Sequence, residues 1–109
     1  MRNKKENKVL TDIIILNTRK ILFRCSELVL ANKTGLTFRI KKTSFDFSQR
    51  ETQNFLNLPV ELFLSQYEIP FFGEIDFIQD IDKYFLEVKI RFMSETPFYY
   101  RECLGELLN

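Results

Sequence analysis

Hydrophobic and polar residues alternate with a period of two along much of this chain, as is typical of β-strands with one buried face. The cleanest case is LTFRI, residues 36–40, in which Leu36, Phe38 and Ile40 alternate with polar residues. The turn-forming residues Asn32–Gly35 stand directly before it. Another alternation follows Pro59, with Val60, Leu62 and Leu64 on its apolar side. These segments predict half-buried strands.

Two further alternating segments, residues 71–77 and 86–92, flank a short polar stretch that contains Asp80 and Asp82. Their polar sides carry an acidic row and a basic row, so we expect a β-hairpin in which the two rows face each other. The predicted opposite positions are Glu74 and Asp76 with the row Glu87, Lys89 and Arg91, and Ile75 and Phe77 with Val88 and Leu86.

The two ends of the chain show helical spacing instead. Near the N-terminus the apolar residues at this spacing are Val9, Leu10, Ile13 and Ile14. They predict a short helix from about Lys5 to Asn17. The isoleucine run at Ile13–Leu16 supports a strand as the alternative, because β-branched residues favour strands. At the other end, Thr96 and Pro97 suit a helix start, and the following apolar face predicts a helix from about Pro97 to Leu108.

The predicted order is therefore a short helix, about six strands and a closing helix, which makes a mainly β fold with an antiparallel barrel or sandwich. With 109 residues the chain has room for one hydrophobic core. We expect residues 1–8 to form a flexible basic tail and residues 9–109 to form a single domain.

Composition narrows the possible functions. The net charge is only +1, which argues against extended binding to duplex DNA, and the chain has no histidine. No zinc spacing, phosphate loop or nucleophile elbow appears, so we expect no metal, no cofactor, no catalytic residue and no enzyme activity. No apolar stretch is long enough to span a bilayer. The two cysteines, Cys25 and Cys103, fit free thiols in a reducing cytoplasm.

Taken together, the order of these segments resembles a PilZ domain over about residues 20–109. The segments that carry the resemblance are the Asn32–Gly35 turn, LTFRI, LNLPVELFL, FFGEIDF and EVKIRF, the last being the closest local match. The resemblance implies a small antiparallel β-barrel followed by a C-terminal helix. It also implies a regulatory module, because many members of the family bind cyclic di-GMP.

The family's ligand motifs are a pair of arginines, RxxxR, and a [D/N]xSxxG turn. The resemblance places the ligand-binding site at Arg19, Arg24, Asn32, Thr34 and Gly35. Both motifs depart from the family pattern. Arg19 and Arg24 are separated by four residues instead of three. If Asn32 and Thr34 begin the turn motif, Gly35 comes two positions early; if Gly35 holds the glycine position, Leu30 stands in place of the acid or amide.

Three functions stay open from the sequence. The first is a cyclic di-GMP receptor that signals through a protein partner, with arginines gripping the phosphates. The second is a PilZ-like scaffold that has lost the nucleotide and acts by protein–protein contact. The third is a barrel-type binder of single-stranded nucleic acid, using aromatic stacking beside Arg39, Lys41 and Lys42.

Overall fold

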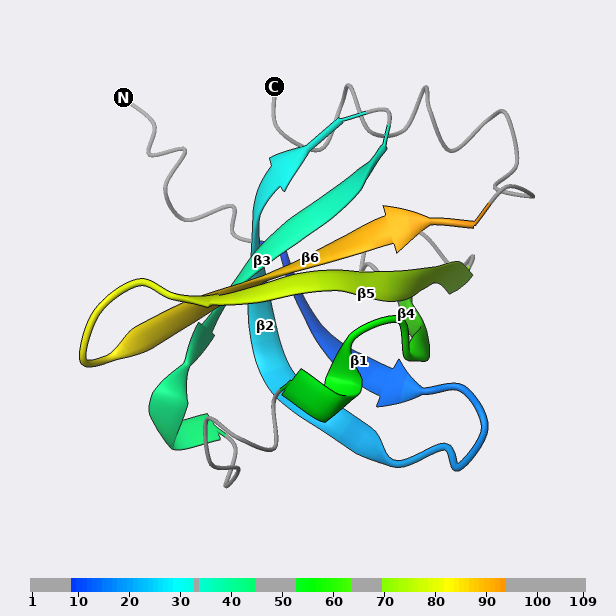
Figure 1. Ribbon diagram of the computed structural model, residues 1–109, viewed down its shortest axis with the longest axis horizontal. Coiled ribbons are helices and arrows are strands. Elements are labelled where there is room, and N and C mark those ends of the chain that lie inside the picture. The colour runs from blue at the N-terminus through cyan, green and yellow to red at the C-terminus, as the bar shows by residue number, and fades with distance from the viewer. Residues whose placement is uncertain (1–8, 33, 45–52, 64–69, 94–109) are drawn as a thin grey trace.

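The computed structural model describes residues 9–32, 34–44, 53–63 and 70–93 and shows a closed, six-stranded antiparallel β-barrel (Figure 1). Around the barrel the strand order is β1-β2-β3-β6-β5-β4, and every neighbouring pair is antiparallel. The strands are β1 (Leu10–Ile15), β2 (Ile21–Ala31), β3 (Gly35–Lys41), β4 (Pro59–Phe63), β5 (Pro70–Asp80) and β6 (Phe85–Phe92). Two 3₁₀ turns, η2 (Lys42–Ser44) and η3 (Gln53–Phe55), follow β3 and precede β4.

The barrel consists of two three-stranded meanders that join at both edges. The β3–β6 and β1–β4 pairings close the sheet on itself, so no strand is left with an open edge. The mainly β class and the barrel of six strands are therefore confirmed. Of the strand predictions, residues 36–40 and the start of the 59–65 alternation lie in β3 and β4, as expected.

The inward positions of the alternation fill the barrel. The largest fully buried side chains include Phe23, Phe38 and Phe71, which come from β2, β3 and β5. The ring of Phe92 lies beside that of Phe71, with 6.3 Å between centroids. The remaining members of the core are Val9, Ile13, Leu22, Leu28, Leu36, Ile40, Val60, Leu62, Ile75, Leu86, Val88 and Ile90. Side chains, and not an open channel, therefore occupy the interior.

The predicted N-terminal helix is wrong over residues 10–15, which form strand β1. Ile13 is fully buried in the core and pairs with Phe23 on one side and Leu62 on the other. The alternative of a strand is the correct one, because the isoleucine run supplies stiff side chains that pack well on a pleated sheet.

The β5–β6 hairpin is present, and Glu74 lies opposite Arg91 of the basic row as predicted, but the predicted apolar pairs are wrong. Ile75 lies opposite Ile90 instead of Val88, and a bulge after Ile75 shifts the pairing further, so that Phe77 lies opposite Lys89 instead of Leu86. Phe77 is consequently 37% exposed, and Ile78 takes the inward direction beside the core.

The C-terminal helix expected at residues 97–108 and the basic tail at residues 1–8 lie outside the described residues. Among the residues that are described, there is no α-helix. The same part of the chain contains no helix with the length and apolar character needed to cross a membrane.

Candidate functional site

The predicted turn at Asn32–Gly35 closes the β2–β3 hairpin, and its described residues hydrogen-bond to one another. The backbone N–H of Asn32 donates to the Gly35 carbonyl at 3.0 Å. The side-chain Oδ1 of Asn32 accepts from the Thr34 N–H at 2.9 Å, the Thr34 hydroxyl at 2.8 Å and the Gly35 N–H at 3.1 Å. These donors point at Asn32, so an anion would have to compete with an existing Asx turn.

Gly35 has a packing role in this turn. A Cβ at this position would lie 2.1 Å from the Ile90 carbonyl oxygen of β6, so no larger residue fits. A cation that sequence reasoning missed also reaches the turn: the Lys89 ammonium donates to the Thr34 hydroxyl at 3.1 Å. Lys89 lies opposite Thr37, three residues beyond Thr34, and its long side chain reaches back along β3 to the turn.

The two predicted arginines lie away from that turn. Arg19 belongs to the β1–β2 turn, where it has a positive φ of 64°, and Arg24 is the fourth residue of β2. Asn32 follows the far end of the eleven-residue strand β2, which spans on the order of 35 Å if fully extended. Figure 1 shows the β1–β2 turn and the β2–β3 hairpin at opposite ends of this strand. The structure therefore does not bring the five predicted residues into one cluster.

Arg19 instead binds a carboxylate on the barrel wall. Its Nη1 donates to Oε1 of Glu61 on β4, forty-two residues further along the chain. The Glu61 side chain is only 9% exposed, whereas that of Arg19 is 57% exposed. The arginine therefore neutralises an almost buried acid.

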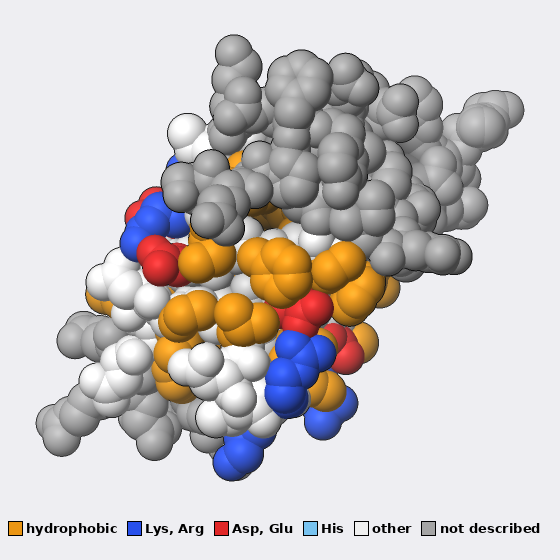
Figure 2. All heavy atoms as spheres, turned by 90° about the vertical axis from the view of Figure 1, so that its right-hand side faces the viewer, with side chains coloured by type: hydrophobic (Ala, Val, Ile, Leu, Met, Phe, Trp, Pro, Cys, Tyr) orange, Lys and Arg blue, Asp and Glu red, His pale blue; other side chains and the backbone are white. Residues whose placement is uncertain are grey.

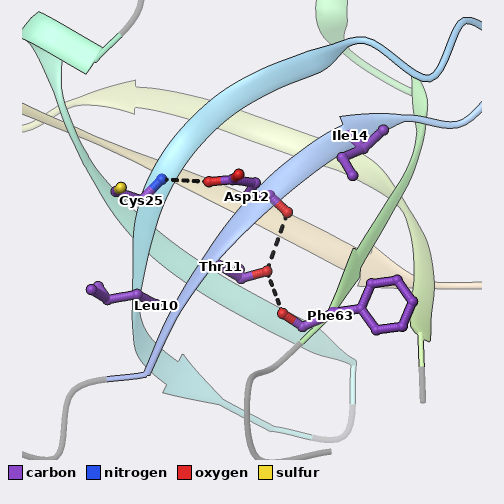
Figure 3. Close-up of a pocket in the computed structure, with 6 residues that line it drawn as sticks. All are labelled: Leu10, Thr11, Asp12, Ile14, Cys25 and Phe63. Carbon is purple, nitrogen blue, oxygen red and sulfur yellow. Dashed lines mark hydrogen bonds between the residues drawn. The ribbon is translucent and has the colours of Figure 1, made fainter. Parts of the chain in front are cut away.

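A groove of about 430 Å³ on the outer side of β1 is the clearest hollow near these residues (Figure 3). Six residues from β1, β2 and β4 line it: Leu10, Thr11, Asp12, Ile14, Cys25 and Phe63. The Thr11 hydroxyl donates to the Phe63 carbonyl, which holds the end of β4 against β1. Asp12 Oδ1 accepts the Cys25 N–H at 2.9 Å, and Cys25 has a positive φ of 52°. These bonds fix the groove wall on three strands.

The surface around this groove is apolar. Leu10 is 45% exposed and Phe63 is 44% exposed. Ile14 pairs with Glu61, and Glu61 pairs in turn with Phe72, which is 40% exposed. Figure 2 shows hydrophobic side chains gathered on one face of the molecule, with charged side chains between and beside them. Apolar groups that gather on an outer barrel face are typical of an interaction surface.

No family model, no curated protein and no solved structure matches this chain. The resemblance over residues 20–109 is supported only at the level of a small six-stranded antiparallel barrel.

Acidic and thiol side chains are scattered over the described residues. No three Cys, Asp or Glu side chains among them lie close enough together to hold a metal ion. Cys25 is an exposed free thiol, and Cys103 lies outside the described residues. What this part of the chain provides is surface: a groove, an apolar patch and a hairpin turn with a lysine beside it.

Proposed function

We propose that this chain is a PilZ-like regulatory module of the cytoplasm that acts by contact with a protein partner, not by catalysis. The observation that carries the proposal is the apolar groove at Leu10, Ile14 and Phe63. The inside of the barrel is filled, so a partner has to bind on the outer surface. The exposed side chains of Leu10 and Phe63, with the half-buried Ile14 between them on the neighbouring strands β1 and β4, provide the apolar centre that protein contacts require.

The chemistry of the groove indicates the kind of partner. Its walls are mainly apolar, but Asp12 lies among them. Within the groove the Asp12 carboxylate accepts one hydrogen bond, from the backbone N–H of Cys25. A carboxylate accepts up to about four hydrogen bonds. The groove therefore suits a peptide segment that inserts an aromatic or aliphatic side chain and places a lysine or arginine against Asp12.

Selection from a displayed peptide library tests this proposal. Purified wild-type protein should enrich peptides that combine a large apolar residue with a nearby cation. Phe63→Asp should weaken the selected peptides by about tenfold or more, since burying a phenylalanine contributes about 1.5–3 kcal/mol. Leu10→Asp, on the other wall, provides a second variant should Phe63→Asp fail to fold.

Leu30→Asp is the matched control, because Leu30 is 50% exposed on β2 but does not line the groove. Its affinity for the selected peptides should equal that of the wild type. Peptides without the expected pattern, or equal weakening by the control, would refute the assignment of the groove as the contact site.

A cyclic di-GMP receptor is the second candidate, and the contact between Lys89 and Thr34 favours it. An ammonium group beside the Asn32–Gly35 turn supplies a charge for a phosphate, as the arginines would. Calorimetric titration with cyclic di-GMP tests it. Binding should then be weakened about tenfold by Lys89→Ala, whereas Arg24→Ala, remote from this turn, should change it little. No heat at high micromolar ligand would leave the protein-contact module as the better account.

A further inference from the structure

The end of β3, η2 and the tip of the β5–β6 hairpin lie at the left in Figure 1. Residues from these three segments line a second hollow, of about 260 Å³. Three lysines and two aromatic rings line it, and none of the lining residues is acidic. The full set is Lys41, Lys42, Thr43, Lys83, Tyr84 and Phe85. Cations beside exposed rings are the combination that recognises phosphate together with a planar base.

The walls of this hollow are held in place by Lys42. Its backbone N–H donates to the Tyr84 carbonyl at 2.8 Å, and its ammonium donates to the Asp82 carbonyl at 2.6 Å. The same ammonium pairs with Asp80 at 2.9 Å. Lys42 therefore ties the hairpin tip to the end of β3 and also neutralises an acid beside the hollow.

The other nearby acid is also engaged. Asp82 Oδ1 accepts the backbone N–H groups of Tyr84 at 2.8 Å and Phe85 at 3.0 Å, which fixes the aromatic pair at the hairpin tip. Ordering the tip before binding lowers the entropy cost of ligand recognition.

Lys41, Lys83 and Tyr84 remain available to a ligand. Tyr84 is 64% exposed, with the Lys83 ammonium 5.6 Å from its ring centroid. Lys41 lies opposite Phe85. The Arg39 guanidinium carbon lies 5.6 Å from the centroid of the Phe85 ring. Positive charge thus lies on both sides of exposed aromatic surface.

We infer that this hollow is a binding site for single-stranded nucleic acid, with one base stacked on Tyr84 and its phosphate between Lys41 and Lys83. Its volume is slightly below the range of pockets for drug-sized ligands, so it holds one nucleotide unit of a strand. Further along the outer side of β3, Arg39 lies opposite Glu87 on β6 and Glu27 on β2, so the net positive charge is concentrated at the hollow itself. An acidic peptide would use these charges, but it would leave the exposed ring unused.

Fluorescence anisotropy with a 5′-labelled octathymidine tests the inference. Tyr84→Ala should raise Kd by about fivefold or more, since stacking on an aromatic side chain contributes substantially to each base. The double variant Lys41→Glu/Lys83→Glu should raise Kd by at least about tenfold. If two phosphates are neutralised, log K should fall with log salt at a slope of about −1.4. Unlabelled AMP should compete more strongly than inorganic phosphate.

Lys20→Glu is the charge-matched control, because Lys20 is an exposed lysine in the β1–β2 turn, away from this hollow. Its Kd should change by less than about twofold in moderate salt. The inference is overturned if octathymidine does not bind at millimolar concentration, if Lys20→Glu weakens binding as much as the double variant does, or if phosphate competes as well as AMP. None of these variants changes the groove at Leu10, so this test is separate from that of the proposed function.

Discussion

Replacing Gly35 with alanine should destabilise the barrel through a steric clash between strands. The new Cβ would lie 2.1 Å from the Ile90 carbonyl oxygen and 2.9 Å from the Arg91 Cα, where real Cβ contacts are essentially never under 3.0 Å. Both neighbours are backbone atoms, so β3 and β6 would have to separate by roughly an ångström. The φ of Gly35 is not positive, and the cost is therefore one of space.

The expected size of the effect follows from two opposing contributions. Overpacking a well-packed interior costs about 1–3 kcal/mol, whereas alanine recovers about 0.4–1 kcal/mol by restricting the unfolded chain. We expect a net loss of about 1–2 kcal/mol in the free energy of unfolding. With a urea m value of about 2 kcal/mol per molar, the midpoint falls by roughly 0.5–1 M.

Urea unfolding followed by far-UV circular dichroism measures this shift. Lys41→Ala is the control on the same strand, since an exposed change should stay within about 0.5 kcal/mol. A Gly35→Ala protein as stable as the wild type would show that the close approach to β6 does not constrain this position. This measurement must precede any ligand titration of the variant, because lost folding would otherwise be mistaken for lost binding.

Three further changes have separate expected outcomes. Arg19→Ala should lower the free energy of unfolding by about 1–2 kcal/mol in thermal or urea unfolding, because it leaves Glu61 almost buried and unpaired. Adding Glu61→Gln to the Arg19→Ala variant should remove most of this loss. If the losses of the two single variants simply add in the double variant, the pairing is contradicted. A double-mutant cycle of Glu74→Ala and Arg91→Ala should give a coupling of about 0.2–1 kcal/mol that falls with salt, since these side chains pair at 2.5 Å and are partly exposed; zero coupling at low salt would refute it. Ser26→Ala should be neutral or stabilising by up to about 1 kcal/mol, because the buried hydroxyl has no hydrogen-bond partner among the described residues; a loss above 1 kcal/mol would indicate a partner.

The strands with strict alternation could be predicted from the sequence because their pattern allows only one inward face. β3 shows this best, since Leu36, Phe38 and Ile40 are almost fully buried. The bulge in β5 could not be predicted in this way. Phe77 and Ile78 are both apolar, so the pattern does not reveal at which of them the alternation changes face.

The N-terminal segment shows how two local signals can conflict. Val9, Leu10, Ile13 and Ile14 fit helical spacing, but the same residues are β-branched or fit a strand. Closure of the barrel favours the strand over the helix, because a strand here pairs with both β2 and β4 and leaves neither with an open edge.

The sites could be predicted less well than the strands, because they join residues that are far apart in the sequence. Arg19 reaches Glu61, and the groove brings Leu10, Cys25 and Phe63 together from three strands. Both arrangements exist only once β4 has paired with β1. The resemblance places Arg19 with Asn32 because it follows the order of motifs along the chain, which does not reveal which strands pair.

The ring order of the strands also decides how the two hollows relate to each other. One lies on β1, beside β2 and β4, and the other lies at the end of β3 and β6. In the order β1-β2-β3-β6-β5-β4, the β1–β4 and β3–β6 pairs are separated by β2 on one side and β5 on the other. They therefore face opposite sides of the barrel. A peptide in the apolar groove and an oligonucleotide at Tyr84 should bind without steric competition. The Kd of octathymidine should be the same for Phe63→Asp and wild type, and saturating peptide should not displace the oligonucleotide. Mutual displacement would mean that one of the two sites is misplaced, or that the barrel changes shape when either is filled.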